Sequence, residues 1–341
     1  MWSLLTLAAL LVLSIQGRGV IVFGTDDPTH NNTAPTGALA GSGWQWVGQL
    51  SSAQATVIGP RHIVTAKHLN IGGAQFVFRG VTYRVTSSTN LAGTDLDVFT
   101  VGGRFPDYAP LCSSRREVGR PVVMIGRGGR RGEAFGTHGW KIGLYDAVQR
   151  WGTNVVDGTL VAGTAELLQM GFAGNAGGDE GMFSSGDSGG GTFILDRDNV
   201  WKLAGVNYGV DGPFATSLSE GPIFAAIFDA RGLYIGFAGQ QQLIPNGPSA
   251  VATRSFVSRI SSSIDWLNTQ IAAPAPADSV VLQSAAGPGG AFTEEPFYGV
   301  DTDLRQIEVP RTADRRFFRA NGVRRLAVES VTDALVRFRY E

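Results

Sequence analysis

Short apolar runs, separated by clusters of small polar residues, repeat along most of this chain. Examples are residues 55–58, 75–78, 82–85, 122–125, 191–195 and 201–204. Runs of four or five residues bounded by Gly, Asn, Asp and Ser are typical of β-strands. Glycine accounts for 47 of the 341 residues and supplies many of the intervening turns. The pattern therefore predicts an all-β chain.

A helical spacing of apolar residues follows this β-rich region. Phe256, Ile260, Ile264, Leu267 and Ile271 recur at intervals of three or four residues, which predicts a helix at about 255–271.

The Pro/Ala segment 273–278 indicates an extended linker. Beyond it, residues 304–309 and 334–340 alternate like strands, so a small β module is expected within the C-terminal extension 279–341. A mostly disordered tail is the alternative.

The N-terminal apolar run, residues 4–13, is too short to cross a membrane and is typical of a secretory signal. We expect a signal peptide at 1–19, with an N-terminal anchor as the alternative. The mature protein is then secreted or associated with the cell envelope, and has no transmembrane span.

Charge is sparse, and the net charge of −1 gives no case for binding nucleic acid. Arginines gather in the extension, at 311, 315, 316, 319, 324 and 325. They make surface association through this segment a further expectation.

The most distinctive motif is Gly186-Asp187-Ser188-Gly189-Gly190-Gly191. A serine becomes a strong nucleophile only when a base takes its proton. Neighbouring glycines permit a tight turn, and leave backbone N–H groups free to face a developing oxyanion. Ser188 is therefore a candidate nucleophile, and the chain must supply a base and an acid that orients it.

All four histidines, at positions 30, 62, 68 and 138, precede Ser188. This order excludes the α/β-hydrolase arrangement, in which the histidine follows the serine. An order of His, Asp and Ser remains available. His68 lies just past the apolar pair Ile63-Val64, and Asp95 begins an alternating segment that ends at Val101.

Three motifs, in this order, resemble those of the trypsin/chymotrypsin-like serine peptidases: Thr65-Ala66-Lys67-His68, Asp95-Leu96-Asp97-Val98 and Gly186-Asp187-Ser188-Gly189-Gly190. Weaker matches are 21–24 to the mature N-terminus, 204–209 to the strand that pairs with bound peptide, and 254–267 to the closing helix. The resemblance covers about residues 21–272. It implies a protease domain at 20–272, built from two six-stranded antiparallel β-barrels at about 38–115 and 119–250, with the catalytic cleft between them.

The resemblance implies a secreted serine endopeptidase that acts on peptide or protein substrates without a cofactor or metal. In it, Ser188 is the nucleophile, His68 the general base and Asp95 the orienting acid, with Asp97 as the alternative acid. The N–H groups of Gly186 and Ser188 form the oxyanion hole. Asp187 pairs with the new α-amine of the processed chain, at or near Ile21.

The same resemblance places the walls of the primary specificity pocket at Met182, Phe183, Ser184 and Ser185 on one side and at Asn207, Tyr208 and Gly209 on the other. Met182 stands where trypsins carry an aspartate, which favours an apolar or small substrate side chain. Asp179 and Glu180 lie close enough in sequence to reverse that preference if either turns inward.

The departures from the family leave other interpretations open. Cys112 is the only cysteine, so no intramolecular disulfide can form, and a buried structural role is expected for it. A catalytically silent peptide-binding relative is one alternative function. A surface-display or adhesion protein, with the extension as its main functional unit, is another. The Gly/Arg-rich segment 126–132 lacks the ending of a phosphate-binding loop and indicates a flexible surface loop. His30, His62 and His138 are expected to be structural.

Overall fold

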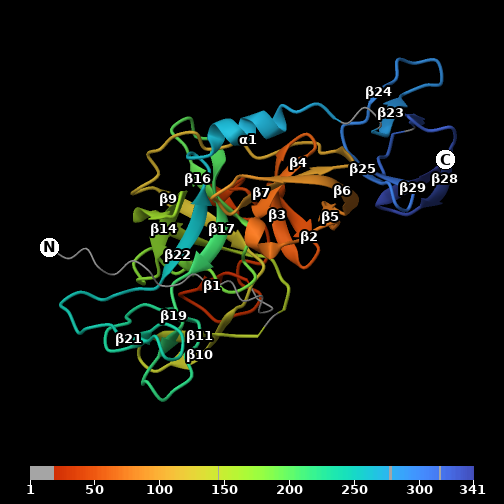
Figure 1. The fold of residues 1–341 in the computed structure, drawn as a ribbon. Coiled ribbons are helices and arrows are strands. Elements are labelled where there is room, and N and C mark those ends of the chain that lie inside the picture. The colour runs from red at the N-terminus through yellow and green to blue at the C-terminus, as the bar shows by residue number, and fades with distance from the viewer. Residues whose placement is uncertain (1–18, 145, 276–278, 315) are drawn as a thin grey trace.

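The computed structural model describes residues 19–144, 146–275, 279–314 and 316–341 (Figure 1). The expected signal peptide, apart from Gly19, and half of the expected linker therefore lie outside the described residues. Within the described ranges, no helix combines the length and the apolar character needed to cross a membrane.

Residues 47–101 form a closed antiparallel barrel, drawn in orange in Figure 1. Its strands, in order around the barrel, are β2 (Val47–Leu50), β3 (Ala53–Gly59), β4 (His62–Ala66), β7 (Leu96–Val101), β6 (Val81–Asn90) and β5 (Gln75–Phe78). Large apolar side chains such as Phe76, Phe78 and Tyr83 fill its interior. This closed six-stranded barrel agrees with the expected first barrel.

The second unit is a seven-stranded antiparallel sheet, whereas a second six-stranded barrel was expected. Its order is β12 (Arg150–Val155), β9 (Pro121–Gly126), β16 (Gly191–Leu195), β17 (Trp201–Val210), β22 (Arg254–Arg259), β14 (Ala165–Gly171) and β13 (Gly158–Ala162). Because β14 pairs with β22 on one side and with β13 on the other, it has no free edge for β12. The Asn154 side chain in β12 instead reaches Gly171 O, at 3.0 Å.

The expected helix at 255–271 begins as a strand and becomes helical only in its second half. Residues Arg254–Arg259 form β22, between β17 and β14, and only Ile264–Ile271 form helix α1. The spacing of Phe256 and Ile260 fits a helix and a strand alike. Hydrogen bonding to β17 on one side and to β14 on the other stabilises the strand. The helix packs Leu267 into a core that both units share, together with Val64 and Leu96 of the barrel and Val123 and Phe193 of the sheet.

Short elements complete the region that precedes the C-terminal extension. Two-stranded pairing joins β1 (Ile21–Val22) to β15 (Gly181–Met182). Two small sheets contain β10 (Arg131–Phe135), β11 (Gly139–Ile142) and β19 (Ala225–Ile227), and β18 (Phe214–Ala215), β20 (Tyr234–Ile235) and β21 (Gln242–Leu243). Single 3₁₀ turns are η1 (Gly37–Leu39), η2 (Trp44–Trp46) and η3 (Lys67–Leu69). Cys112 is buried and free, and burial raises the pKa of its thiol.

The C-terminal extension is a β module, drawn in blue in Figure 1. One sheet contains β24 (Thr293–Glu294), β23 (Val281–Ala285) and β27 (Phe317–Asn321). The other contains β28 (Leu326–Val331), β29 (Leu335–Tyr340), β26 (Gln306–Pro310) and β25 (Tyr298–Asp301), and it continues into β8 (Gly103–Arg104), just after the barrel. The module is therefore hydrogen-bonded to the first unit.

Candidate functional site

His68 and Asp95 come together because their strands are neighbours. Strand β4 ends at Ala66, which pairs with Leu96 at the start of β7, so the residues just beyond this pair lie side by side. The 3₁₀ turn η3 follows β4 directly and contains His68. One Asp95 oxygen, Oδ1, accepts the backbone N–H of His68 at 2.8 Å. This bond fixes the carboxylate beside the imidazole.

The three side chains that the motifs single out form a hydrogen-bonded row. His68 Nδ1 lies 2.7 Å from Asp95 Oδ2, and His68 Nε2 lies 2.8 Å from Ser188 Oγ. The carboxylate can only accept, so Nδ1 carries the proton and Nε2 accepts from the serine hydroxyl. The His68 and Asp95 side chains are 13% and 12% exposed, so the row is shielded but reachable from solvent.

The turn around Ser188 depends on its glycines. Gly186 and Gly189 have φ of 95° and 81°, in the left-handed region that favours glycine. A Cβ at Gly189 would overlap with Thr65 Oγ1 in β4. Among the residues that the structure describes, neither the Gly186 nor the Ser188 N–H has a protein acceptor. Both donors are therefore free to bind the oxygen of a substrate.

Asp187 is a buried carboxylate, and its donors among the described residues are neutral. Its Oδ1 accepts Gly128 N–H at 2.7 Å, and its Oδ2 accepts Ser184 N–H at 2.7 Å and the Ser184 hydroxyl at 3.2 Å. Burial raises the pKa of Asp187 to about 7, although these hydrogen bonds favour its charged form. The side chain is 1% exposed, so its charge has no access to water.

The Gly/Arg-rich segment 126–132 is part of this arrangement, and its expected role as a flexible surface loop is wrong. Gly128 and Gly129 are buried, and their N–H groups donate to Asp187 and to Ser184. The signal for this role was present in the sequence as consecutive glycines, which leave N–H groups accessible, but the acid that they serve is 59 residues away.

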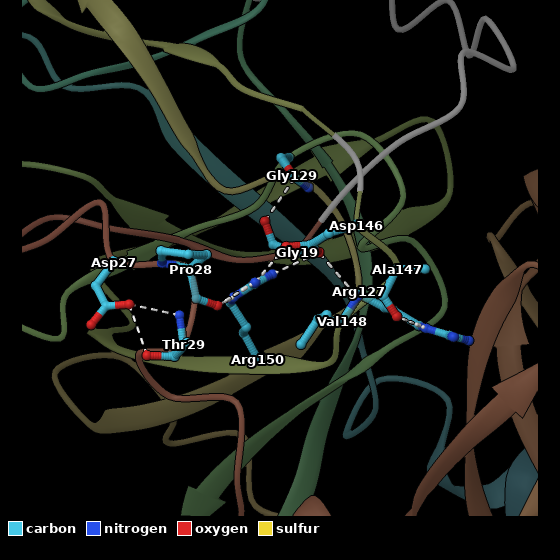
Figure 2. Close-up of polar contacts among 11 residues, drawn as sticks. Gly19, Asp27, Pro28, Thr29, Arg127, Gly129, Asp146, Ala147, Val148 and Arg150 are labelled. Atoms are coloured by element: carbon cyan, nitrogen blue, oxygen red, sulfur yellow. Dashed lines mark hydrogen bonds and ion pairs between the residues drawn. The ribbon is translucent and has the colours of Figure 1, made fainter.

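The chain just before β1 lies against the same group. Ser184 Oγ donates to Gly19 O at 2.9 Å, and Figure 2 shows Gly19 beside Gly129 and Arg127. Arg150 holds the following segment by donating to Pro28 O, and it also contacts Asp146 (Figure 2). Ile21 is fully buried and pairs with Met182, whereas Gly19 O reaches the surroundings of Asp187 through the Ser184 hydroxyl.

Two of the expected pocket-wall residues lie in the core. Met182 is fully buried with Ile21 and Phe172, because β1 covers β15, and Phe183 packs in the interior of the sheet. Ser184 serves Asp187, as described above. Of the expected wall residues, Ser185, Tyr208 and Gly209 are partly exposed. The Tyr208 ring meets the His68 ring edge-on, with 5.9 Å between the ring centroids.

The two acids near the expected pocket point elsewhere. Asp179 Oδ1 contacts His30 Nε2 at 2.6 Å and accepts from Asn31 Nδ2 at 3.0 Å. Glu180 is buried and accepts the N–H groups of Gly174 and Ala176. Both carboxylates therefore hold loops together, and neither is available to bind a basic substrate side chain here.

The remaining titratable candidates lie outside the row. Asp97 lies in β7 and does not hydrogen-bond His68, whose carboxylate partner is Asp95, and burial raises the pKa of Asp97. His62 is buried in β4, and burial lowers its pKa. His138 Nδ1 contacts Asp229 O at 2.7 Å. In the described part of the chain, no group of three or more His, Cys, Asp or Glu side chains is arranged to hold a metal ion.

No protein-family model matches this chain, and no curated protein sequence matches it. Among solved structures, it is similar to neuropsin, a serine protease expressed in the limbic system of mouse brain, with 12% identity, a TM-score of 0.43 and coverage of 68% of this chain and 96% of neuropsin. It is also similar to an inactive form of the Rv3671c protease, with 14% identity, a TM-score of 0.41 and coverage of 72% and 97%. These scores are too low to assign a family, so the chemistry must be inferred from the geometry of the site.

Proposed function

We propose that this chain is a serine endopeptidase that hydrolyses peptide bonds through His68, Asp95 and Ser188. The observation that carries the proposal is the contact of Ser188 Oγ with His68 Nε2, at 2.8 Å, on an imidazole that Asp95 orients. A serine so placed can lose its proton as it attacks a carbonyl carbon. The motifs around these residues resemble those of trypsin-like peptidases, which supports a peptide or protein substrate.

In the proposed reaction, Ser188 Oγ attacks the carbonyl carbon of the scissile bond while His68 Nε2 takes the hydroxyl proton. Asp95 keeps the Nδ1 proton in place and stabilises the imidazolium that forms. His68 then gives its proton to the leaving amine, and the acyl group remains on Ser188. Water then attacks the acyl carbon while His68 takes one of its protons. His68 returns this proton to Ser188 Oγ as the ester bond breaks and the carboxylic acid leaves.

The negative oxygen of each tetrahedral intermediate would be held by the N–H groups of Gly186 and Ser188. Neither donor has an acceptor in the described part of the chain, and the two flank the buried Asp187 within one tight turn. Preorganised backbone donors of this kind are typically worth about 3–4 kcal/mol each in the transition state. The turn that holds Asp187 therefore also sets the positions of these donors.

We further propose that cleavage between Gly19 and Val20 supplies a cation to Asp187. The sequence pointed to an amine at or near Ile21, but Ile21 is held in the β1–β15 pair, whereas Gly19 O already bonds Ser184 beside Asp187. The α-amine of Val20 would replace that peptide group. A buried carboxylate without a cation is costly, so pairing would stabilise the turn around Ser188.

A chain that begins at Val20 is therefore expected to hydrolyse peptides at least about 10-fold faster than one that begins at Gly19. The reason is that a buried carboxylate without its cation destabilises the turn that carries Ser188. The comparison requires defined N-termini, for example by release from a fusion partner, with kcat/KM measured on a mixed peptide library. Equal activity of the two chains would exclude the pairing.

The unprocessed chain is expected to lose stability as pH rises from about 4 to about 7. The pKa of Asp187 is about 7 in the folded state and 3.8 unfolded, so folding favours the protonated acid. This contribution is complete below pH 4 and is lost as the pH passes 7.

The measurement is the Tm of unprocessed Ser188→Ala protein against the same chain with Asp187→Asn, at pH 5 and pH 8. The Asn variant, which is neutral at both values, should gain relative Tm at the higher pH. A Tm difference that does not depend on pH would contradict the uncompensated burial of Asp187. In the processed chain the amine should remove most of this dependence.

The test of the proposed activity is reaction of the processed chain with a fluorophosphonate, followed by mass spectrometry of the modified peptide. An adduct on Ser188, together with cleavage of a mixed peptide library, supports the peptidase. Folded, processed protein that gives neither result supports the alternative of a silent peptide-binding relative. The apolar run at 4–13 supports the further proposal that the protein is exported.

A further inference from the structure

The side chain of Asn207 in β17 lies directly behind the turn that carries Ser188. It is 1% exposed, and its Nδ2 donates to Asp187 O at 3.0 Å and to Ile125 O at 2.7 Å. Its Oδ1 accepts the Thr192 hydroxyl at 2.9 Å. The two carbonyls can only accept, so they fix which end of the amide is nitrogen.

The backbone of the same residue bonds the other side of the nucleophile. Gly189 N–H donates to Asn207 O at 3.0 Å, and Asn207 N–H donates to Gly190 O at 2.9 Å. Asn207 thus contacts the residue before Ser188 and the two residues after it. A Cβ at Gly190 would overlap with Ile125 O and crowd Asn207 Nδ2, so the turn rests tightly on this amide.

We propose that Asn207 is a positioning residue that sets the place of Ser188 Oγ relative to His68 Nε2. The inference rests on the proposed function, and it gives Asn207 a task other than the pocket wall that the motif suggested. The side-chain amide joins three segments, β9 through Ile125, β16 through Thr192 and the nucleophile turn through Asp187. Loss of the amide would leave Asp187 O bound only by Gly190 N–H, at 3.1 Å, among the described residues.

Asn154 offers a matched control within the same sheet. It is 4% exposed, its Nδ2 donates to Gly171 O at 3.0 Å and Gly181 O at 2.9 Å, and its Oδ1 accepts Val155 N–H at 2.7 Å. Its burial and number of hydrogen bonds therefore resemble those of Asn207. None of its partners belongs to the turn at 186–190, so its loss should cost stability without moving Ser188.

The experiment compares Asn207→Ala and Asn154→Ala in the processed full chain. The second-order rate of fluorophosphonate labelling of Ser188 should fall at least 10-fold in the first variant and less than 3-fold in the second. With a peptide substrate, kcat should fall more than KM rises, because the turn is displaced and the cleft is retained. Equal rates for Asn207→Ala and wild type, or equal slowing in both variants, would overturn the inference.

A second readout does not depend on activity. Exchange of the Gly189 and Gly190 amide hydrogens should be faster in Asn207→Ala than in wild type and unchanged in Asn154→Ala. Unchanged protection of these amides in Asn207→Ala would overturn the positioning role, whether or not the wild-type protein is active. A wild-type protein that does not react with the fluorophosphonate would overturn only the proposed activity. Asn207→Asp, which keeps the size and the Thr192 contact, gives the same two readouts if the alanine variant does not fold.

Discussion

Replacing Ser188 by alanine is expected to lower kcat/KM for peptide hydrolysis by roughly 10⁴-fold or more and to abolish fluorophosphonate labelling. The hydroxyl oxygen is the atom that would attack the substrate, and its proton is the one that His68 Nε2 would accept. Stability should hardly change, because the side chain makes one hydrogen bond and is partly exposed. The measurements are kcat/KM on a mixed peptide library and Tm.

His68→Ala should cause a loss of similar size, and the double variant should be no slower than either single one, because the residues act as a unit. Asp95→Asn should lower the rate by about 10⁴-fold, through loss of the correct imidazole tautomer. Two controls match these changes. Asp97→Asn neutralises a nearby carboxylate that does not bond His68, and Ser219→Ala removes an exposed serine. Activity that survives in Ser188→Ala would exclude the proposed mechanism.

Gly299→Ala, far from the reacting groups, is expected to lower the free energy of unfolding by about 3 kcal/mol. Gly299 lies in β25, and a Cβ there would overlap with the backbone of Thr82 in β6. The module would have to move off the barrel, because neither backbone can give way alone. At about 2–4 °C per kcal/mol for a chain of this size, Tm should fall by roughly 6–12 °C.

Gly287→Ala is the matched control, since a Cβ at that position in the same module meets no atom within 4 Å. Its Tm should stay within about 2 °C of wild type. A similar Tm for both variants would mean that the contact between β25 and β6 contributes little.

Deletion of residues 279–341 should destabilise the first barrel by a comparable or larger amount. Phe297 and Leu335 of the module pack against the barrel core, and each such side chain is worth about 1.5–3 kcal/mol when fully buried. The same deletion would remove the Glu308 carboxylate that accepts Thr82 N–H and the Glu294 partner of Arg61. An unchanged Tm would instead favour an independent attachment module.

The charges of the module bear on that alternative. Four arginines form ion pairs within the module: Arg337 with Glu308, Arg339 with Glu329, Arg316 with Glu295 and Arg311 with Asp333. Among the described arginines of the basic cluster, Arg311 and Arg316 have such a partner, so the positive potential of the cluster is reduced only in part. The contacts between the module and the barrel support a role in holding the barrel more directly than a role in binding an anionic surface.

Several features of this protein follow from the sequence alone, because they depend on short-range patterns. Two-residue alternation identifies strands such as β7 and β29, and the relative order of His68, Asp95 and Ser188 excludes one hydrolase class. The glycines that flank Ser188 indicate a turn that other residues cannot form. The strands and the turn need only neighbours within a few positions, and the order of the three residues is read directly along the chain.

Other features were decided by partners far away in the chain. Residues 254–259 became a strand because β17 and β14 offered ladders on both sides, which no local spacing of Phe256 and Ile260 can reveal. The β13–β14 hairpin occupied the edge that a closed second barrel would need. Gly128 bonds Asp187, which lies 59 residues later in the chain, and Asn207 bonds Asp187 of the nucleophile turn, which lies 20 residues earlier.

The chemistry that we propose for this chain can thus be inferred from motifs, whereas the environment of the proposed site cannot. A motif states which side chains are present in order, and the tertiary structure sets which buried polar groups become their partners. Because a buried carboxylate or amide must be satisfied by whatever the fold brings near, the surroundings of Asp187 and Asn207 were determined only when distant segments packed together.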